Sequence, residues 1–295
     1  MKHSILQGAY DMHIHSGPDI MPRKVDDMET AQRLIAAGMA GFVIKSHYVC
    51  TADRATLTNK VYPECKAFGA IELNNSVGGL NPIAVDIAGR AGAKVVWFPT
   101  VDTLSSLRDA EKMPPEKAPY WVGILKELRK DNVPLSTVDV VDENGKVLPA
   151  VYDVLDMIAK YNMILATGHI SVEEVFAVVK AAHERKVERI IITHADSPLA
   201  FFEIDQQKEL VSKYGVYIEH CTNGVTTGKV SYEVLKEQIR QVGCDHVINT
   251  TDLGQAGRKF PDEGMLDLVT WMLENGFSET EIRKTIVDNP IKLLS

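Results

Sequence analysis

Short apolar runs recur along the chain, and each is bounded by polar or turn-forming residues. The eight runs are Gly8–His13, Gly41–Lys45, Ala67–Leu73, Ala93–Phe98, Met163–Thr167, Arg189–Thr193, Val216–Glu219 and His246–Asn249. Several are nearly continuous β-branched stretches, such as Ile190-Ile191-Ile192-Thr193. Such stretches are typical of parallel strands that are buried on both faces. The pattern therefore predicts eight strands of a parallel sheet.

Amphipathic segments with helical spacing lie between most of these runs. The clearest are Asp26–Ala37, Ser171–Lys186 and Ser231–Val242. A glycine follows the first and the last, and the second opens with Ser171 and Glu174 in a capping-box arrangement. Eight strands that alternate with helices predict a (β/α)₈ TIM barrel, formed by residues 1–295 as a single domain. The structural alternative is a doubly wound open sheet, which normally has fewer strands.

One interval, between Phe98 and Met163, is too long for a single βα unit. It contains a helical stretch over Tyr120–Lys130, and alternating apolar residues flank Asn144-Gly145. Because both positions of an Asn-Gly turn tolerate positive φ, this pattern predicts a β-hairpin. We expect an insertion of about residues 101–160 after the fourth strand, placed either over the catalytic end or at a subunit interface.

Composition narrows the classes of partner. The net charge is −8 and no Lys/Arg run stands out, which argues against a nucleic-acid partner. Residues 1–10 do not resemble a signal peptide, and no apolar run reaches about 18 residues, so no membrane partner is expected. The four cysteines are scattered without paired spacing, which fits a reducing cytoplasm better than a disulfide framework, so we expect a cytoplasmic protein.

Six of the nine histidines fall at the ends of the apolar runs. The first two lie in Asp11-Met12-His13-Ile14-His15. Residues i, i+2 and i+4 of a strand share one face, so this segment is expected to present a carboxylate and two imidazoles side by side. That is the kind of ligand set that a divalent metal needs.

The other strand ends add further polar groups. In chain order they are Lys45 and His47, Glu72 and Asn74, His169, His194 with Asp196, Glu219 with His220, and Asp252. The chemistry of a barrel sits at these ends of its strands. Other interpretations remain open at this point, since His169 could cap the following helix and Asp252 could form a turn before Gly254. The fourth strand ends in Trp97-Phe98-Pro99-Thr100 and offers no ionisable group.

This ordered set resembles the amidohydrolase superfamily of metal-dependent hydrolases. The ending Ile286-Val287-Asp288-Asn289-Pro290-Ile291-Lys292-Leu293-Leu294 is similar to the Asn-Pro-x-x-Leu-Leu-like ending of many such barrels. Leu73–Pro82 and Lys45-Ser46-His47 resemble an uncharacterised amidohydrolase-like branch, which brings no known substrate with it. The resemblance implies that a divalent metal, most simply Zn²⁺, is bound by His13, His15, His169, His194 and Asp252.

The fourth strand departs from the family pattern. Members with two metals usually place a carboxylated lysine or a glutamate there, and Trp97–Thr100 supplies neither. We therefore expect one metal ion per chain. The alternative is two ions, with Lys45 and His47 providing the second site.

The residues support hydrolysis by a metal-activated water, with Asp252 as the proton carrier and His194 as a ligand or as the group that polarises the scissile carbonyl. The expected substrate is a small anionic molecule with an amide, lactam, ester or lactone. Arg23 and Arg54 are candidates to bind its carboxylate. Asn74 and His220 are further candidate substrate-binding residues.

Three other functions remain open. The first is a phosphoesterase of the polymerase-and-histidinol-phosphatase type, which also uses a His-x-His barrel. The second is a decarboxylase or hydratase with a single metal, and the third is a metal-binding barrel without enzymatic activity. Since such barrels are commonly homo-oligomers, we expect self-association as well.

Overall fold

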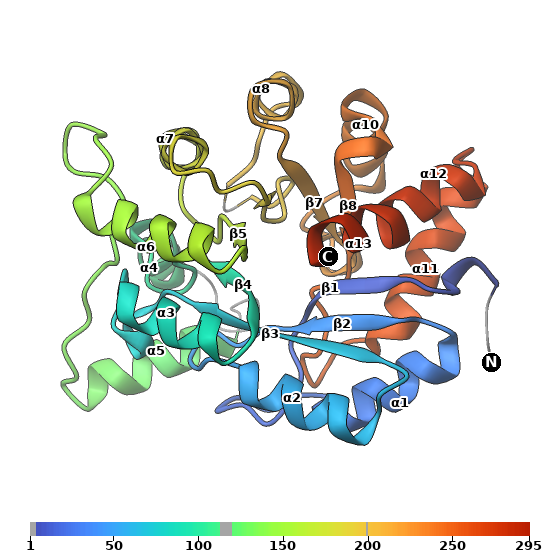
Figure 1. Ribbon diagram of the computed structural model, residues 1–295, viewed down its shortest axis with the longest axis horizontal. Helices are drawn as coiled ribbons and strands as arrows, with labels where there is room; N and C mark the ends of the chain where they lie inside the picture. Colours follow the sequence, from blue (N-terminus) through green and yellow to red (C-terminus); the bar gives the residue numbers. More distant parts are fainter. Residues whose placement is uncertain (1–3, 113–119, 199) are drawn as a thin grey trace.

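The computed structural model describes residues 4–112, 120–198 and 200–295. Eight parallel strands form one sheet in chain order, each hydrogen-bonded to the next (Figure 1). The strands are β1 (Tyr10–Ile14), β2 (Gly41–Ile44), β3 (Lys66–Glu72), β4 (Ala93–Trp97), β5 (Ile164–Ala166), β6 (Ile190–Ile192), β7 (Tyr217–Cys221) and β8 (Val247–Thr250). The sheet curls into a nearly closed barrel, and the predicted (β/α)₈ TIM barrel is confirmed.

The two ends of the sheet meet just beyond β8. The backbone N–H of Asp252 donates to the carbonyl of His13 at 2.9 Å, and the N–H of His15 donates to the carbonyl of Leu253 at 2.8 Å. These hydrogen bonds connect the residues that follow β8 with the end of β1. They place Asp252 directly beside the two histidines of β1 and its following loop.

Side chains of each strand alternate between two apolar environments. Met12, Val43, Ala70, Val95 and Ile248 belong to the cluster inside the barrel. Alternate residues pack outward against the helices. Because both faces of the sheet are buried, the strands read as continuous apolar runs in the sequence.

Helices surround the barrel and follow the strands. They are α1 (Asp27–Ala37), α2 (Ala52–Val61), α3 (Pro82–Arg90), α6 (Pro149–Lys160), α7 (Val172–Glu184), α8 (Ile204–Tyr214), α9 (Thr222–Thr226), α10 (Tyr232–Val242), α11 (Pro261–Glu274), α12 (Glu279–Arg283) and α13 (Asn289–Leu294). Short 3₁₀ turns cover Ser4–Leu6, Asn75–Val77 and Cys244–His246, and a π-helical turn covers Lys284–Asp288. The predicted capping box of α7 is present, with Ser171 N–H donating to Glu174 Oε2 at 2.7 Å.

The last helix closes the end of the barrel where the strands begin. Leu293 and Leu294 of α13 join the inner apolar cluster, and Lys94 near the start of β4 donates to the carbonyl of Ser295. Figure 1 shows the C-terminus near the middle of the ring of strands. The functional groups therefore gather at the opposite end.

The long interval after β4 contains two additional helices, α4 (Leu104–Lys112) and α5 (Tyr120–Lys130). Residues 113–119 of the expected insertion lie outside the described part of the chain. The expected hairpin consists of an antiparallel bridge between Val141 and Val147, around a turn in which Gly145 has φ 75°. The next helix, α6, packs against α3 and α7 as a barrel helix does, so the extra segment ends near residue 148 rather than 160.

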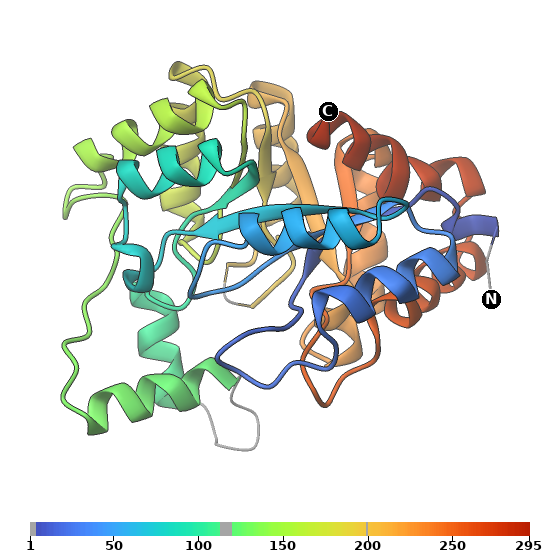
Figure 2. The same ribbon diagram turned by 60° about the horizontal axis from the view of Figure 1, so that its bottom comes forward.

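The extra helices pack over the end of the barrel that carries the strand-end histidines. Trp121, Val122 and Leu125 of α5 form an apolar cluster with Met21 from the loop after β1, and Tyr48 from the loop after β2 packs against it. Figure 2 shows α5 on the same side of the barrel as the loop after β1. The extra helices thus lie over the end of the barrel where the strand-end histidines gather, which is one of the two positions expected from the sequence.

Within the described residues, no helix is long and apolar enough to cross a membrane. All four cysteines are free thiols, as their scattered spacing predicts.

Candidate metal centre

Five histidines form a closed ring at the strand ends. The distances between neighbouring ring centroids are 5.4 Å for His13–His15, 4.9 Å for His15–His47, 6.2 Å for His47–His169, 4.9 Å for His169–His194 and 6.3 Å for His194–His13. All five side chains are buried. The four histidines expected to bind metal are therefore brought together, and His47 completes their circle.

An irregularity in β1 places His13 in this ring. The pairing of β1 with β2 shifts register between Asp11 and Ile14, so β1 has one more residue than β2 over this stretch. Met12 consequently packs inside the barrel while the ring of His13 also lies inside, 5.5 Å from that of Trp97. The expectation that Asp11 lies beside the two imidazoles is wrong, because the bulge breaks the two-residue period.

Asp11 instead joins β1 to the residues after β8. Its carboxylate accepts hydrogen bonds from the backbone N–H of His13 at 3.1 Å, and from the N–H and hydroxyl of Thr251 at 3.1 and 2.5 Å. Burial outweighs these hydrogen bonds and raises the pKa of Asp11 to about 7.

Asp252 lies against the first two histidines. Its Oδ1 atom is 3.2 Å from Nε2 of His13 and 3.2 Å from Nε2 of His15. Its Oδ2 atom accepts a hydrogen bond of 3.1 Å from the side chain of Asn223. These three residues form a group whose ligand atoms are close enough to share one ion.

Two residues of the site adopt backbone conformations that non-glycine residues rarely have. The φ angles of His194 and Asp252 are 30° and 50°. Such strain persists where the surrounding structure fixes it, and it is concentrated at functional sites. Gly254 supports this region, because a Cβ atom at that position would lie 1.8 Å from the carbonyl oxygen of His15.

Glu219 fixes the orientation of His13. Its Oε1 atom lies 3.1 Å from Nδ1 of His13, while Nε2 of the same ring faces Asp252. Burial acts to lower the pKa of His13, but Glu219 and Asp252 outweigh it and raise the pKa to about 9. Although burial alone would raise the pKa of Asp252, His13 and the hydrogen bonds from His13 and His15 hold it well below its usual value.

Three other histidines of the ring have lowered pKa values, so their imidazoles favour the neutral form. Burial lowers the pKa of His15, His169 and His194, and nearby positive charges add to the effect: Arg23 for His15, and Lys45 for His169 and His194. A neutral imidazole keeps a lone pair for a metal ion. In addition, Nδ1 of His194 is a buried atom without a hydrogen-bond partner. This orphaned nitrogen, the neutral imidazoles and the adjacent carboxylate fit a divalent ion of the zinc type.

A second carboxylate–histidine pair orients His47. Oε2 of Glu72 lies 2.8 Å from Nδ1 of His47, and it also accepts a 2.8 Å hydrogen bond from the hydroxyl of Thr100. The side chain of Asn74 donates to the carbonyl of His47 at 2.9 Å and to the Thr100 hydroxyl at 2.8 Å. Asn74 thus holds this network in place. The Nζ atom of Lys45 lies 4.0 Å from Oε1 of Glu72.

The family comparison covers the residues of the histidine ring. A family model described as "Family of unknown function (DUF6282)" matches residues 8–219, a span that contains all five imidazoles of the ring and Glu219. The chain belongs to the DUF6282 family. No curated protein matches this chain.

Solved structures with the same fold resemble this DUF6282 member over nearly its full length. An amidohydrolase from Pseudomonas aeruginosa is 10% identical with a TM-score of 0.60, covering 98% of this chain and 96% of that one. A putative 2-pyrone-4,6-dicarboxylic acid hydrolase from Pseudomonas putida is 13% identical with a TM-score of 0.58, covering 97% of each chain. A 2,6-dihydroxybenzoate decarboxylase from Rhizobium is 13% identical with a TM-score of 0.54, covering 98% of each chain. At these identities the likeness concerns the fold alone, which is the barrel fold that the sequence predicts.

Of the two candidate substrate-binding arginines of this DUF6282 chain, Arg23 borders the histidine ring and Arg54 does not. Nη2 of Arg23 lies 3.4 Å from Nδ1 of His15, so this guanidinium borders the ring, where it also pairs with Asp19 at 2.7 Å. Arg54 lies apart from the ring, where it binds the buried carboxylate of Asp27 at 2.7 and 2.8 Å. It also donates to the carbonyl of Ser16 at 2.8 Å, so it holds the loop after β1 to α1.

His220 also faces away from the ring. It neighbours Glu219 on β7, so its side chain points to the opposite face of the strand, and its Nδ1 atom lies 3.0 Å from Oδ2 of Asp196. Glu219 is the functional group whose role the sequence does not reveal. The alternation of β7 gives a signal, because Tyr217 and Glu219 share the face that points into the barrel.

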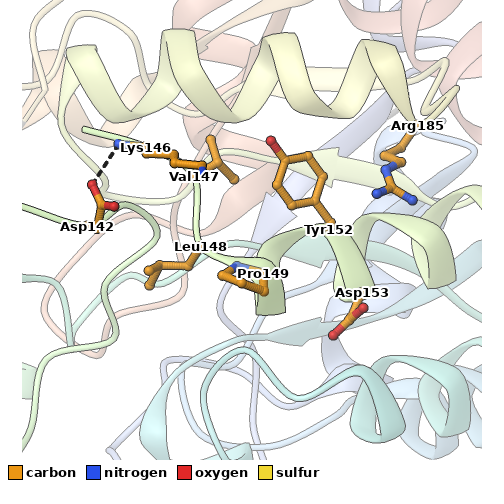
Figure 3. Close-up of a pocket in the computed structure, with 8 residues that line it drawn as sticks. All are labelled: Asp142, Lys146, Val147, Leu148, Pro149, Tyr152, Asp153 and Arg185. Carbon is orange, nitrogen blue, oxygen red and sulfur yellow. Dashed lines mark hydrogen bonds between the residues drawn. The ribbon is translucent and has the colours of Figure 1, made fainter. Parts of the chain in front are cut away.

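A separate surface pocket of about 400 Å³ lies between the hairpin turn, α6 and the end of α7 (Figure 3). It is lined by Asp142, Lys146, Val147, Leu148, Pro149, Tyr152, Asp153 and Arg185. None of the ring histidines contributes to it, so it is distinct from the candidate metal centre.

Proposed function

We propose that this protein is a metal-dependent hydrolase that cleaves a C–N or C–O bond of a small, anionic amide, lactam, ester or lactone. The observation that carries the proposal is the position of Asp252, whose Oδ1 atom is 3.2 Å from Nε2 of both His13 and His15. A carboxylate held against two ligand nitrogens is suited to bind an ion and to exchange a proton beside it.

The residues that would hold the ion are His13, His15, His169, His194 and Asp252, with Zn²⁺ as the expected metal. When bound, such an ion supplies Lewis acidity, which lowers the pKa of a water molecule to about 7. The end of β4 that faces the ring offers no ionisable side chain, since Trp97 occupies the inward position there. This supports one ion per chain.

The protein's own groups supply the proton transfers. Asp252 takes the proton of the attacking water and returns it to the leaving group. Asn223 donates to Oδ2 of Asp252 and so directs Oδ1 toward the histidines. Glu219 keeps Nδ1 of His13 paired, which leaves Nε2 of that ring facing the reaction site.

Positive charge beside the ring favours an anionic substrate. Arg23 borders His15, and Lys45 lies inside the barrel near Glu72. The names of proteins with the same fold agree with this substrate class, because they include a 2-pyrone-4,6-dicarboxylic acid hydrolase and a 2,6-dihydroxybenzoate decarboxylase. If Arg23 binds the substrate carboxylate, Arg23→Ala raises KM for the substrate, whereas Arg54→Ala leaves KM unchanged.

Decarboxylation of an anionic substrate is the second candidate. Trp97 on β4 favours a single ion, and one protein with the same fold is a decarboxylase. The two candidates differ in their products, since hydrolysis releases an amine, alcohol or ring-opened acid, whereas decarboxylation releases CO₂.

Metal analysis combined with a substrate screen tests the proposal. The purified protein should contain about one divalent ion per chain, and a panel of anionic amides, lactams, esters and lactones should reveal turnover. Asp252→Asn should lower kcat by about 10²- to 10⁴-fold. The matched control is Asp153→Asn, on α6 and away from the ring. Full activity in Asp252→Asn would refute Asp252 as the proton carrier. Three bound metal ions per chain, together with phosphatase activity, would favour a phosphoesterase.

A further inference from the structure

Lys45 is a fully buried lysine at the end of β2, with only 1% of its surface exposed. Its Nζ atom lies 5.1 Å from the centre of the Trp97 ring and 4.0 Å from Oε1 of Glu72. A distance of 4.0 Å is long for an ion pair in the interior, where an ammonium group is costly unless it is closely paired. The proposed function uses this charge only as one of two that favour an anionic substrate, and it gives no reason for a lysine beside Glu72.

Glu72 is similarly incomplete. Its Oε2 atom accepts from His47 and Thr100, but its buried Oε1 atom has no hydrogen-bond partner and faces Lys45. The fold therefore holds an ammonium and a carboxylate oxygen near each other without a hydrogen bond between them. Both charges therefore still act on the ring of histidines.

One aromatic ring connects Lys45 with the first histidine of the ring. Trp97 lies 5.1 Å from Nζ of Lys45 and 5.5 Å from the imidazole of His13, so it holds the lysine close to the histidines.

The buried charges suggest what the lysine does. Among the described residues, the carboxylates paired with histidines of the ring are those of Glu72, Glu219 and Asp252. Arg23 also borders the ring, but Asp19 neutralises its charge. One divalent ion together with the Lys45 ammonium balances their three negative charges, whereas two divalent ions beside the lysine would leave an excess of two positive charges. An uncompensated charge in a buried site is strongly unfavourable.

We propose that Lys45 is a built-in cation that takes the place of a second metal ion, so that the centre binds one divalent ion. This inference rests on the proposed metal dependence and adds the reason for the ion count. Without the lysine, one ion leaves the site with an excess of one negative charge, so a second ion gains affinity.

Metal titration of Lys45→Met tests the inference, because methionine keeps most of the volume and removes the charge. We would titrate metal-free protein with Zn²⁺ and Co²⁺ by calorimetry and count the bound ions by elemental analysis. The wild type should bind one equivalent. Lys45→Met should bind two equivalents, with a Kd for the second ion at least 10-fold lower than any weak second binding in the wild type. The matched control Lys94→Met, near the start of β4 at the other end of the barrel, should bind one equivalent.

A second measurement uses only the wild type, in case the variant does not fold. The Co²⁺-loaded wild type should show the electron paramagnetic resonance spectrum of isolated, uncoupled ions. The intact mass, measured under native conditions, should show an unmodified Lys45 in buffer with and without bicarbonate. Two bound ions in the wild type, or a carboxylated Lys45, would overturn the inference and leave the proposed function standing. One equivalent in a folded Lys45→Met would do the same. No bound metal in the wild type would instead overturn the proposed function.

Discussion

Glu219 on β7 reaches past β8 to His13 on β1, with 3.1 Å between its Oε1 atom and Nδ1 of the imidazole. Both side chains are buried, at 1% and 0% exposure. Burial alone would raise the pKa of Glu219, but His13 outweighs it and lowers the pKa to about 2. The carboxylate is therefore charged at neutral pH and holds one edge of the first histidine.

Replacing Glu219 with glutamine should weaken metal binding. The amide lacks the charge that orients His13 and strengthens it as a ligand, so we expect the Kd for Zn²⁺ to rise by about 10- to 100-fold. Competition with a chelator measures this change. Glu233→Gln on the exposed face of α10 serves as the control. An unchanged Kd in Glu219→Gln would show that the pair does not serve the metal.

Gly254→Ala should distort the site through the backbone. Residue 254 has φ 127°, and the added Cβ would meet the carbonyl of His15 at 1.8 Å. We expect a loss of on the order of 3 kcal/mol in the free energy of unfolding, together with weaker metal binding. Chemical denaturation measures the first and calorimetry the second. In Gly257→Ala, where the added Cβ has no atom within 4 Å, both quantities should stay at their wild-type values.

The stability of the metal-free protein should depend on pH through Asp11. Its pKa is raised from 3.8 to about 7, so the folded state holds the proton more tightly than the unfolded state does. The contribution of Asp11 to stability is then greatest below the unfolded pKa and is lost as pH rises from about 4 to 7, by up to about 4 kcal/mol.

Denaturant unfolding between pH 4 and 8 measures this fall. Asp11→Asn removes this titrating group, so its stability should fall by up to about 4 kcal/mol less between pH 4 and 7 than that of the wild type. Asp262→Asn on α11 is the control. An Asp11→Asn profile with the same slope as the wild type would contradict the assignment to Asp11.

Arg54→Ala should reduce stability rather than substrate binding. Arg54 neutralises Asp27, and removing it leaves a carboxylate that is 6% exposed without its partner. The expected loss in the free energy of unfolding is about 3 kcal/mol. Arg185→Ala breaks an exposed pair with Asp156 and should cost less than about 1 kcal/mol. Equal losses in the two variants would show that the Arg54 pair is not specially stabilising.

The sequence predicts most of the fold, because strands that are buried on both faces leave continuous apolar runs. It also predicts that the histidines converge, since the C-terminal ends of parallel strands meet at one end of a barrel. The position of Asp11 could not be predicted, because the bulge in β1 depends on its pairing with β2. The partner of Arg54 could not be predicted either, since Asp27 lies on a different element and only the packing of α1 against α2 brings the two together.

The way in which the sheet ends meet has a consequence for assembly of the site. The first and last strands are joined through the N–H groups of His15 and Asp252, and those same two residues supply ligand atoms to one proposed ion. An ion bound there bridges the seam of the barrel, so its binding energy also resists the parting of β1 from β8. Binding of the proposed ion and closure of the barrel are thereby thermodynamically linked, and hydrogen exchange along this seam should slow when metal is added.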